Sequence, residues 1–144
     1  MILEATLTLT IDGNLKRIVC NVYDKTYPIR VNGYAVGRMM CADGKWVCGA
    51  TELNPYAESI INSYAAVRKK FKWNLPERLR NAILWGKYNI DTKDFECAIV
   101  DSVTFEWFEA ELKAALAANN IQPDLLLRLY QPRIITYYND GIKL

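Results

Sequence analysis

Histidine is absent from the 144-residue chain, and this absence limits the chemistry that the protein can perform. Ser-His-Asp and Cys-His nucleophile systems, histidine metal sites and the usual proton shuttle near neutral pH all require an imidazole. Carboxylate, tyrosine or lysine chemistry remains open, but no recognisable catalytic motif accompanies these side chains. The sequence therefore predicts a noncatalytic protein, and no catalytic residue is assigned.

Cysteine is scarce as well. The four cysteines are Cys20, Cys41, Cys48 and Cys97. They form no Cys-x-x-Cys pair, and without histidine companions a zinc site is not expected. A glycine-rich phosphate loop is also missing. We predict buried free thiols, no metal ligand and no cofactor.

The sequence contains no long apolar run. No stretch approaches the roughly 18 apolar residues that span a bilayer, and the opening residues MILEATLTLTIDGN lack the basic and hydrophobic regions of a signal peptide. We therefore expect a soluble, cytoplasmic protein without membrane association. The residues that are present, 51% hydrophobic and 24% charged, are typical of a folded globule. At this length, residues 1–144 are expected to form a single domain.

The first fifty residues predict a series of antiparallel strands. Apolar and polar residues alternate through ILEATLTLTI at 2–11, which is typical of a strand with one buried face. Asp12-Gly13, Asn32-Gly33 and Asp43-Gly44 are typical of two-residue hairpin turns. Strands are therefore expected at 2–11, 15–24, 28–31, 34–42 and 45–51.

The first turn also predicts the pairing of the first two strands. A type I′ turn at residues 12–13 places Leu7 opposite Ile18 and Ala5 opposite Cys20. This register keeps one face of the hairpin apolar, which supports it.

A similar argument applies to two of the cysteines. Across the turn at residues 43–44, Cys41 should face Trp46, and Cys48 should be a diagonal neighbour of Cys41. Diagonal neighbours lie roughly 7–8 Å apart, beyond the usual Cα separation of a disulfide. We therefore predict that both thiols are reduced.

The apolar spacing changes after residue 53 and predicts helices. Asn54 as N-cap and Pro55 should open a helix that buries Ala57, Ile60, Ile61, Tyr64, Val67 and Phe71. Further helices are expected from Pro76 to Gly86, over 104–118 and from Pro123 through residue 130, with strands at 94–103 and 133–138. The predicted class is α+β. In this fold an N-terminal antiparallel β-meander of about five short strands packs against three to four helices, and a C-terminal strand returns to the sheet.

The most basic stretch, AAVRKKFKWNLPERLR at 65–80, is the first candidate binding site. Its interleaved cations and aromatic ring could contact phosphates and stack an unpaired base. The candidate residues are Arg68, Lys69, Lys70, Lys72, Trp73, Arg78 and Arg80. A structural interpretation stands beside this one, because cations complement the dipole at the end of any helix. Single-stranded nucleic-acid binding through 68–80 is therefore kept as an alternative function.

Acidic residues supply a second alternative. Asp91, Asp94, Glu96 and Asp101 surround one predicted strand, and Asp94 and Glu96 should share a face. A divalent metal for phosphodiester hydrolysis could bind there. The Glu-x-Lys sequence in EAELK lies in the strongest predicted helix, however, which is the wrong element for such a nuclease. A metal-dependent hydrolase or nuclease is the second alternative.

Aromatic residues favour a different function. The chain has more aromatic residues than its core obviously requires: Trp46, Trp73, Trp85, Trp107, Tyr130, Tyr137 and Tyr138. Exposed Trp, Tyr and Arg are common anchors of protein interfaces. The helix predicted at 104–118 should pair Glu109 with Lys113 and bury a stripe of Phe105, Phe108, Leu112, Ala115 and Leu116. Trp107 lies away from this stripe, and the strand with Tyr137 and Tyr138 could be an edge open to a second chain, which would permit a homo-oligomer.

We therefore expect a small intracellular binding protein, an accessory or inhibitory factor that acts on a larger partner. A protein or nucleoprotein partner is favoured over free nucleic acid, because the formal net charge is only +2. Small phage or mobile-element proteins that bind host machinery share this profile as a class.

Overall fold

The computed structural model describes residues 2–22, 24, 26–71, 75–122, 124–132, 136–137 and 141–143. The first half contains β1 (Ile2–Ile11), β2 (Asn14–Asn21), β3 (Pro28–Val31), β4 (Tyr34–Ala42), β5 (Lys45–Cys48), the 3-10 helix η1 (Thr51–Tyr56) and α1 (Ala57–Lys70). The second half contains α2 (Glu77–Ala82), β6 (Ile83–Asn89), β7 (Asp94–Ile99), α3 (Phe105–Ala118), β8 (Leu126–Gln131), β9 (Thr136–Tyr137) and β10 (Ile142–Lys143).

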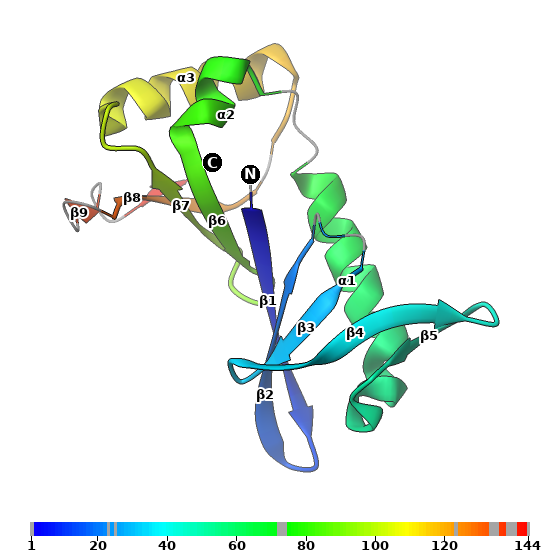
Figure 1. Cartoon of the computed structure of the whole chain (residues 1–144). Coiled ribbons are helices and arrows are strands. Elements are labelled where there is room, and N and C mark those ends of the chain that lie inside the picture. The colour runs from blue at the N-terminus through cyan, green and yellow to red at the C-terminus, as the bar shows by residue number, and fades with distance from the viewer. Residues whose placement is uncertain are drawn as a thin grey trace.

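The described strands form a mixed sheet (Figure 1) in the order β10-β8-β7-β6-β1-β2-β3-β4-β5, with β9 paired to β8. The pairs β1·β6 and β7·β8 are parallel. The predicted α+β class fits this structure, but the predicted arrangement is wrong. The sheet is not a five-stranded antiparallel meander with one returning strand, because β6, β7 and β8 extend it beyond β1. Strand β1 therefore lies inside the sheet, with the hairpin strand β2 on one side and β6 on the other.

The hairpins of the first half have the predicted register. Asp12 and Gly13 have φ angles of 51° and 78°, and the turns at 32–33 and 43–44 have the same left-handed conformation. Leu7 pairs with Ile18. Ala5 pairs with Cys20 and Cys41 with Trp46, as predicted. Local turn chemistry and the alternation of apolar residues are sufficient to determine these pairings.

Two segments that the sequence predicts as helices are strands. Residues 83–86, expected within a helix that ends at Gly86, belong to β6, because α2 covers only Glu77–Ala82. Residues 126–130, expected in a short helix, belong to β8. Short apolar runs do not distinguish a helix from a buried strand, and pairing with β1 and β7 favours the strand. Of the final strand predicted at 133–138, Thr136–Tyr137 form β9, and the other four residues lie outside the described residues.

Helix α1 buries the predicted apolar face but begins later than expected. Asn54 and Pro55 lie in η1, and α1 starts at Ala57. Asn54 is therefore not the N-cap of α1, and its Oδ1 instead accepts a hydrogen bond from the Cys48 N–H at 2.6 Å. This bond links η1 to the end of β5.

Helix α3 begins after Thr104, whose Oγ1 accepts a hydrogen bond from the Trp107 N–H at 3.1 Å. Its buried side chains are Phe108, Leu112, Ala115 and Leu116. Phe105, which the sequence predicts to be buried, is only partly buried. The predicted pair of Glu109 and Lys113 forms at 2.8 Å.

The helices cover one face of the sheet. Leu3, Ala5 and Leu7 point to this face, where they belong to one hydrophobic cluster with the apolar side chains of α1, α2 and α3. The side chains between them, such as Glu4 and Thr8, lie on the opposite face, which no helix in the described ranges covers. We call this second surface the open face.

Three of the four cysteines are buried, but Cys41 is exposed, so the prediction of buried thiols is wrong for Cys41. All four are free. Among the described helices, none is long and apolar enough to cross a membrane.

Candidate functional site

The basic segment 68–80 is divided among several structural contacts. Arg68 Nε donates a hydrogen bond to the Val22 carbonyl oxygen at 2.8 Å, and Nη2 of the same guanidinium donates to the same oxygen. The guanidinium carbon also lies 5.1 Å from the centre of the Tyr27 ring. Arg68 therefore joins α1 to the chain that follows β2.

Two further cations of the segment have partners within the chain. Lys70 Nζ donates to the Asp124 carbonyl oxygen at 3.1 Å and lies 5.6 Å from the Tyr88 ring centre. Arg78 pairs with Glu111 at 2.5 Å, which joins α2 to α3.

Lys69 and Arg80 are exposed, whereas Lys72 and Trp73 lie outside the described residues. The basic segment as a binding site stays a prediction; among the described residues its exposed cations are Lys69, Arg80 and Arg78, of which Arg78 is paired with Glu111.

The aromatic candidates are separated from one another. Trp107 is half-buried and packs against the core cluster. Tyr137 belongs to β9, where it pairs with Tyr130 of β8. Tyr138 lies outside the described residues.

The open face carries a row of alternating charges across four neighbouring strands. Arg128 of β8 lies beside Glu96 of β7 in the register. Glu96 in turn neighbours Lys87 of β6, which lies beside Glu4 of β1. Neighbouring strands are about 4.8 Å apart, so each charge has an opposite charge beside it. We call Arg128, Glu96, Lys87 and Glu4 the charged row.

An apolar row runs alongside the charged row, two residues along each strand. The Trp85 and Tyr130 ring centres lie 6.2 Å apart, and Ala98, which lies between them in the register, is fully buried. Ile2 pairs with Trp85 and is 53% exposed. Lys87 Nζ lies 4.8 Å from the Trp85 ring centre and connects the two rows. We call Tyr130, Ala98, Trp85 and Ile2 the apolar row.

Shallow hollows cover much of the open face. Three of them, of about 310, 180 and 260 Å³, are all lined by Lys87. A fourth, of about 470 Å³, shares Glu4 with the second and third. A broad and shallow surface of this kind suits a macromolecule better than a small molecule, which usually requires a concave pocket that encloses it.

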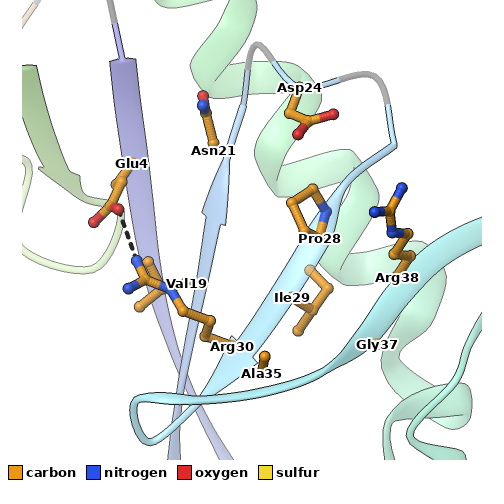
Figure 2. A pocket seen from close by; sticks show the side chains of 10 residues that line it. All are labelled: Glu4, Val19, Asn21, Asp24, Pro28, Ile29, Arg30, Ala35, Gly37 and Arg38. Carbon is orange, nitrogen blue, oxygen red and sulfur yellow. Dashed lines mark ion pairs between the residues drawn. The ribbon is translucent and has the colours of Figure 1, made fainter.

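The hollow of 470 Å³, which we call the bulge cleft, forms at an irregularity between β3 and β4 (Figure 2). Ile29 pairs with Gly37 but Arg30 pairs with Ala35, so Val36 is an extra residue in β4. Gly37 has a φ angle of 136°, and a Cβ there would lie 3.3 Å from the Gly49 Cα. A bulge bends its strand, and this bend opens the cleft.

The bulge cleft combines an apolar floor with two sets of charges. Val19 is buried beneath it, and Pro28 and Ala35 complete the apolar lining, whereas the Ile29 side chain, opposite Cys20, belongs to the core cluster on the other face. On the β1 side, Arg30 Nη2 lies 2.7 Å from Glu4 Oε1 (Figure 2).

The opposite side of the bulge cleft holds Asp24 and Arg38 (Figure 2). Asp24 Oδ1 accepts hydrogen bonds from the Thr26 N–H at 2.9 Å and from Thr26 Oγ1 at 2.7 Å. These two bonds, with the charge of Arg38 nearby, lower the pKa of the Asp24 carboxyl. Arg38 is exposed and forms no ion pair with any described residue.

The acidic cluster of the sequence is partly assembled. Asp94 and Glu96 share the open face as predicted, and Thr92 Oγ1 donates to Asp94 Oδ2 at 3.1 Å. Asp91 Oδ2 instead accepts from the Thr8 N–H at 3.0 Å, which ties the turn before β7 to β1. Within the described ranges, no group of three or more acidic or cysteine side chains is placed to hold a metal ion.

Cys20 and Cys97 are poor nucleophiles. Burial raises the pKa of Cys20 and of Cys97 to about 12, so the reactive thiolate is rare near neutral pH.

Comparison of the chain with models of known protein families finds no match, and comparisons with curated proteins and with solved structures find none either. The candidate site is therefore assigned from geometry alone. Sequence reasoning missed Arg38, Lys87 and Arg128. A signal for the latter two existed in the alternation Trp85-x-Lys87 and Arg128-x-Tyr130, which would identify an exposed strand face once β6 and β8 are recognised as strands.

Proposed function

We propose that the protein is a noncatalytic binding protein whose open face recognises a protein partner, with the bulge cleft receiving an acidic side chain of that partner beside an apolar one. The observation that carries this proposal is exposed Arg38 next to the apolar floor formed by Val19 and Pro28. An Arg guanidinium binds a carboxylate through two parallel hydrogen bonds, which favours Asp or Glu on the partner.

The mixed charge of the open face favours a protein over a nucleic acid. Across the charged row the signs alternate, so a phosphate backbone laid along it would meet Glu4 and Glu96 as often as Lys87 and Arg128. Nucleic-acid binding requires cations that follow the phosphates.

Binding of this kind would act by blocking or bridging a site on the larger partner, which is the accessory or inhibitory role that the sequence predicts, in the cytoplasm. The anchors would be desolvated against the partner, as at other protein interfaces.

A selection from a library of random displayed peptides tests the proposal even though the partner is unidentified. The immobilised wild-type protein should enrich peptides in which Asp or Glu stands next to a large apolar residue. Their affinity should fall roughly tenfold or more in Arg38→Glu, because the new carboxylate repels the acidic side chain. Enrichment that is unchanged in Arg38→Glu, or selection of basic peptides, would refute the cleft as the site.

A matched charge reversal in the basic segment separates the alternatives. Lys69→Glu/Arg80→Glu changes two exposed cations and should leave peptide binding unchanged. If it abolishes peptide binding while Arg38→Glu does not, the basic segment is the site. A labelled oligodeoxythymidine of about 20 nucleotides, longer than most single-strand sites, serves as the nucleic-acid probe. Binding that falls steeply with salt and is lost in the double variant would favour the nucleic-acid alternative.

A further inference from the structure

The charged row is complementary to itself under a two-fold rotation. Along the sheet its signs run plus, minus, plus, minus in the order Arg128, Glu96, Lys87 and Glu4. A second copy can lie with its open face against the first, related to it by a two-fold axis that is parallel to the strands and passes between β7 and β6. In this arrangement the order of the charges in the second copy is the reverse of the order in the first. Glu96 then faces Lys87 of the second copy, and Arg128 faces Glu4 of the second copy. Every charge therefore meets an opposite charge, which is the condition for a symmetric interface between identical chains.

The apolar row obeys the same rotation. Tyr130, Ala98, Trp85 and Ile2 occupy the same four strands in the same order. Ile2, which is 53% exposed, comes to face Tyr130 of the second copy, and the Trp85 side chains lie close to the axis. The same two-fold rotation thus brings apolar side chains against apolar ones and each charge against an opposite charge. It would also cover Ile2, Trp85 and Tyr130, which are partly exposed in the single chain.

The row on the other side of the charged row, two residues farther along each strand, also contains a pair that fits the two-fold rotation. Asp94 of β7 and Asn89 of β6 line the same hollow of about 310 Å³. After the rotation, Asp94 faces Asn89 of the second copy, where a carboxylate can accept a hydrogen bond from an amide. The charged row, the apolar row and the inner pair of this third row are therefore consistent with one axis, whereas its outer positions, Leu126 and Thr6, add no complementary contact.

We propose that the half of the open face formed by β8, β7, β6 and β1 binds a second copy of this chain, face to face, about the two-fold axis between β6 and β7. The occupant is argued from charge complementarity along the charged row and from the matching apolar row. The bulge cleft lies mainly on β2, β3 and β4 and reaches the four overlapping strands only at Glu4, whose carboxylate is also paired with Arg30. A dimer would therefore display two clefts, and the proposal does not depend on the function proposed for the cleft.

Charge reversal at the residues nearest the axis tests the dimer. Sedimentation equilibrium of the wild-type chain should give a species of twice the 16.5 kDa chain mass that dissociates as salt is raised. In Lys87→Glu, Glu96 would face a second carboxylate across the axis, so the dissociation constant should rise roughly tenfold or more. Glu96→Lys should have the same effect with the opposite charges.

Two combinations identify the contact itself. An equimolar mixture of Lys87→Glu and Glu96→Lys should form a heterodimer, because each new charge meets its opposite across the axis. The double variant Lys87→Glu/Glu96→Lys should form a homodimer again. Lys45→Glu, an equal charge change at an exposed residue of β5, is the control and should leave the dimer intact. Circular dichroism of each variant verifies that the fold is retained.

The outcomes separate the alternatives. A wild-type chain that remains monomeric at several hundred micromolar overturns the proposal. A wild-type dimer that withstands Lys87→Glu also overturns it, because another surface, such as the edge strand β5, would then hold the copies together. Monomeric single variants that do not associate on mixing contradict the two-fold axis. A dimer that fails while Arg38-dependent peptide binding persists leaves the proposed function in place.

Discussion

Substitution of Gly86 by alanine should destabilise the protein through a clash with one aromatic ring. Gly86 lies in the middle of β6, and a Cβ there would lie 2.5 Å from Phe95 Cε2 and 2.8 Å from Phe95 Cζ. The Phe95 ring is buried and packs against Phe71 with ring centres 4.7 Å apart, so it has little room to move away. Overpacking costs about 1–3 kcal/mol, and the lower chain entropy of alanine returns about 0.5–1 kcal/mol.

The expected net loss is about 1 kcal/mol, within a range of about 0–2.5 kcal/mol, and each kcal/mol corresponds to roughly 2–4 °C in melting temperature for a domain of this size. Thermal and urea unfolding followed by circular dichroism measure this loss. Gly49→Ala is the matched control, because the nearest atom to its Cβ lies at 3.6 Å; without a clash its stability should not fall and should rise by up to about 1 kcal/mol. In a Phe95→Leu background the cost of Gly86→Ala should fall by about 1 kcal/mol. An equal cost in both backgrounds would refute the clash as its cause.

Three further predictions concern single side chains. Cys41 should react quickly with a thiol reagent in the native protein. Cys20 and Cys97 should react only after unfolding, because they are buried and their pKa values are about 12. Fast labelling of Cys20 or Cys97, located by mass spectrometry, would contradict this. Gln131→Leu should lower the free energy of unfolding, measured in urea, by about 1–3 kcal/mol. The reason is that the Gln131 amide donates hydrogen bonds to two carbonyl oxygens before α3, those of Val100 and Val103, at 3.0 and 2.7 Å. An unchanged urea midpoint would show that water replaces these bonds. The pKa of Asp24 is lowered in the folded state, so its ionised carboxylate stabilises the fold above the unfolded pKa, and this contribution is lost as the pH falls below about 4. The stability difference between the wild type and Asp24→Asn should therefore shrink on acidification in unfolding experiments at a series of pH values, and a difference that grows would contradict the sign.

The first half of the fold could be predicted from the sequence to the level of residue pairs. Asp12-Gly13 sets both the turn and the register, so Leu7 meets Ile18 without information from distant parts of the chain. The second half could not be predicted in this way. By its sequence context Gly86 is typical of a helix end, whereas it is the point at which β6 makes room for the Phe95 ring.

The candidate site could not be predicted from the sequence for the same reason. Its charged row joins Glu4 to Lys87 through a parallel pairing between strands far apart in the sequence, and no turn specifies the register of such a pair. The sequence did predict that Asp94 and Glu96 share a face, because that relation lies within one strand. The bulge cleft depends on one extra residue in β4, Val36, beside Gly37, which the alternation of side chains in β4 does not reveal.

The position of β1 has a consequence for folding during synthesis. Its hairpin with β2 can close as soon as the first residues emerge, but its other partner, β6, begins at residue 83, about 70 residues after β1 ends. At ribosomal rates of about 5–20 residues per second, the backbone groups along that side of β1 wait roughly 4–14 s for their partner. During this interval the nascent chain exposes an unpaired edge, which makes the newly made N-terminal half the part most prone to self-association or chaperone capture.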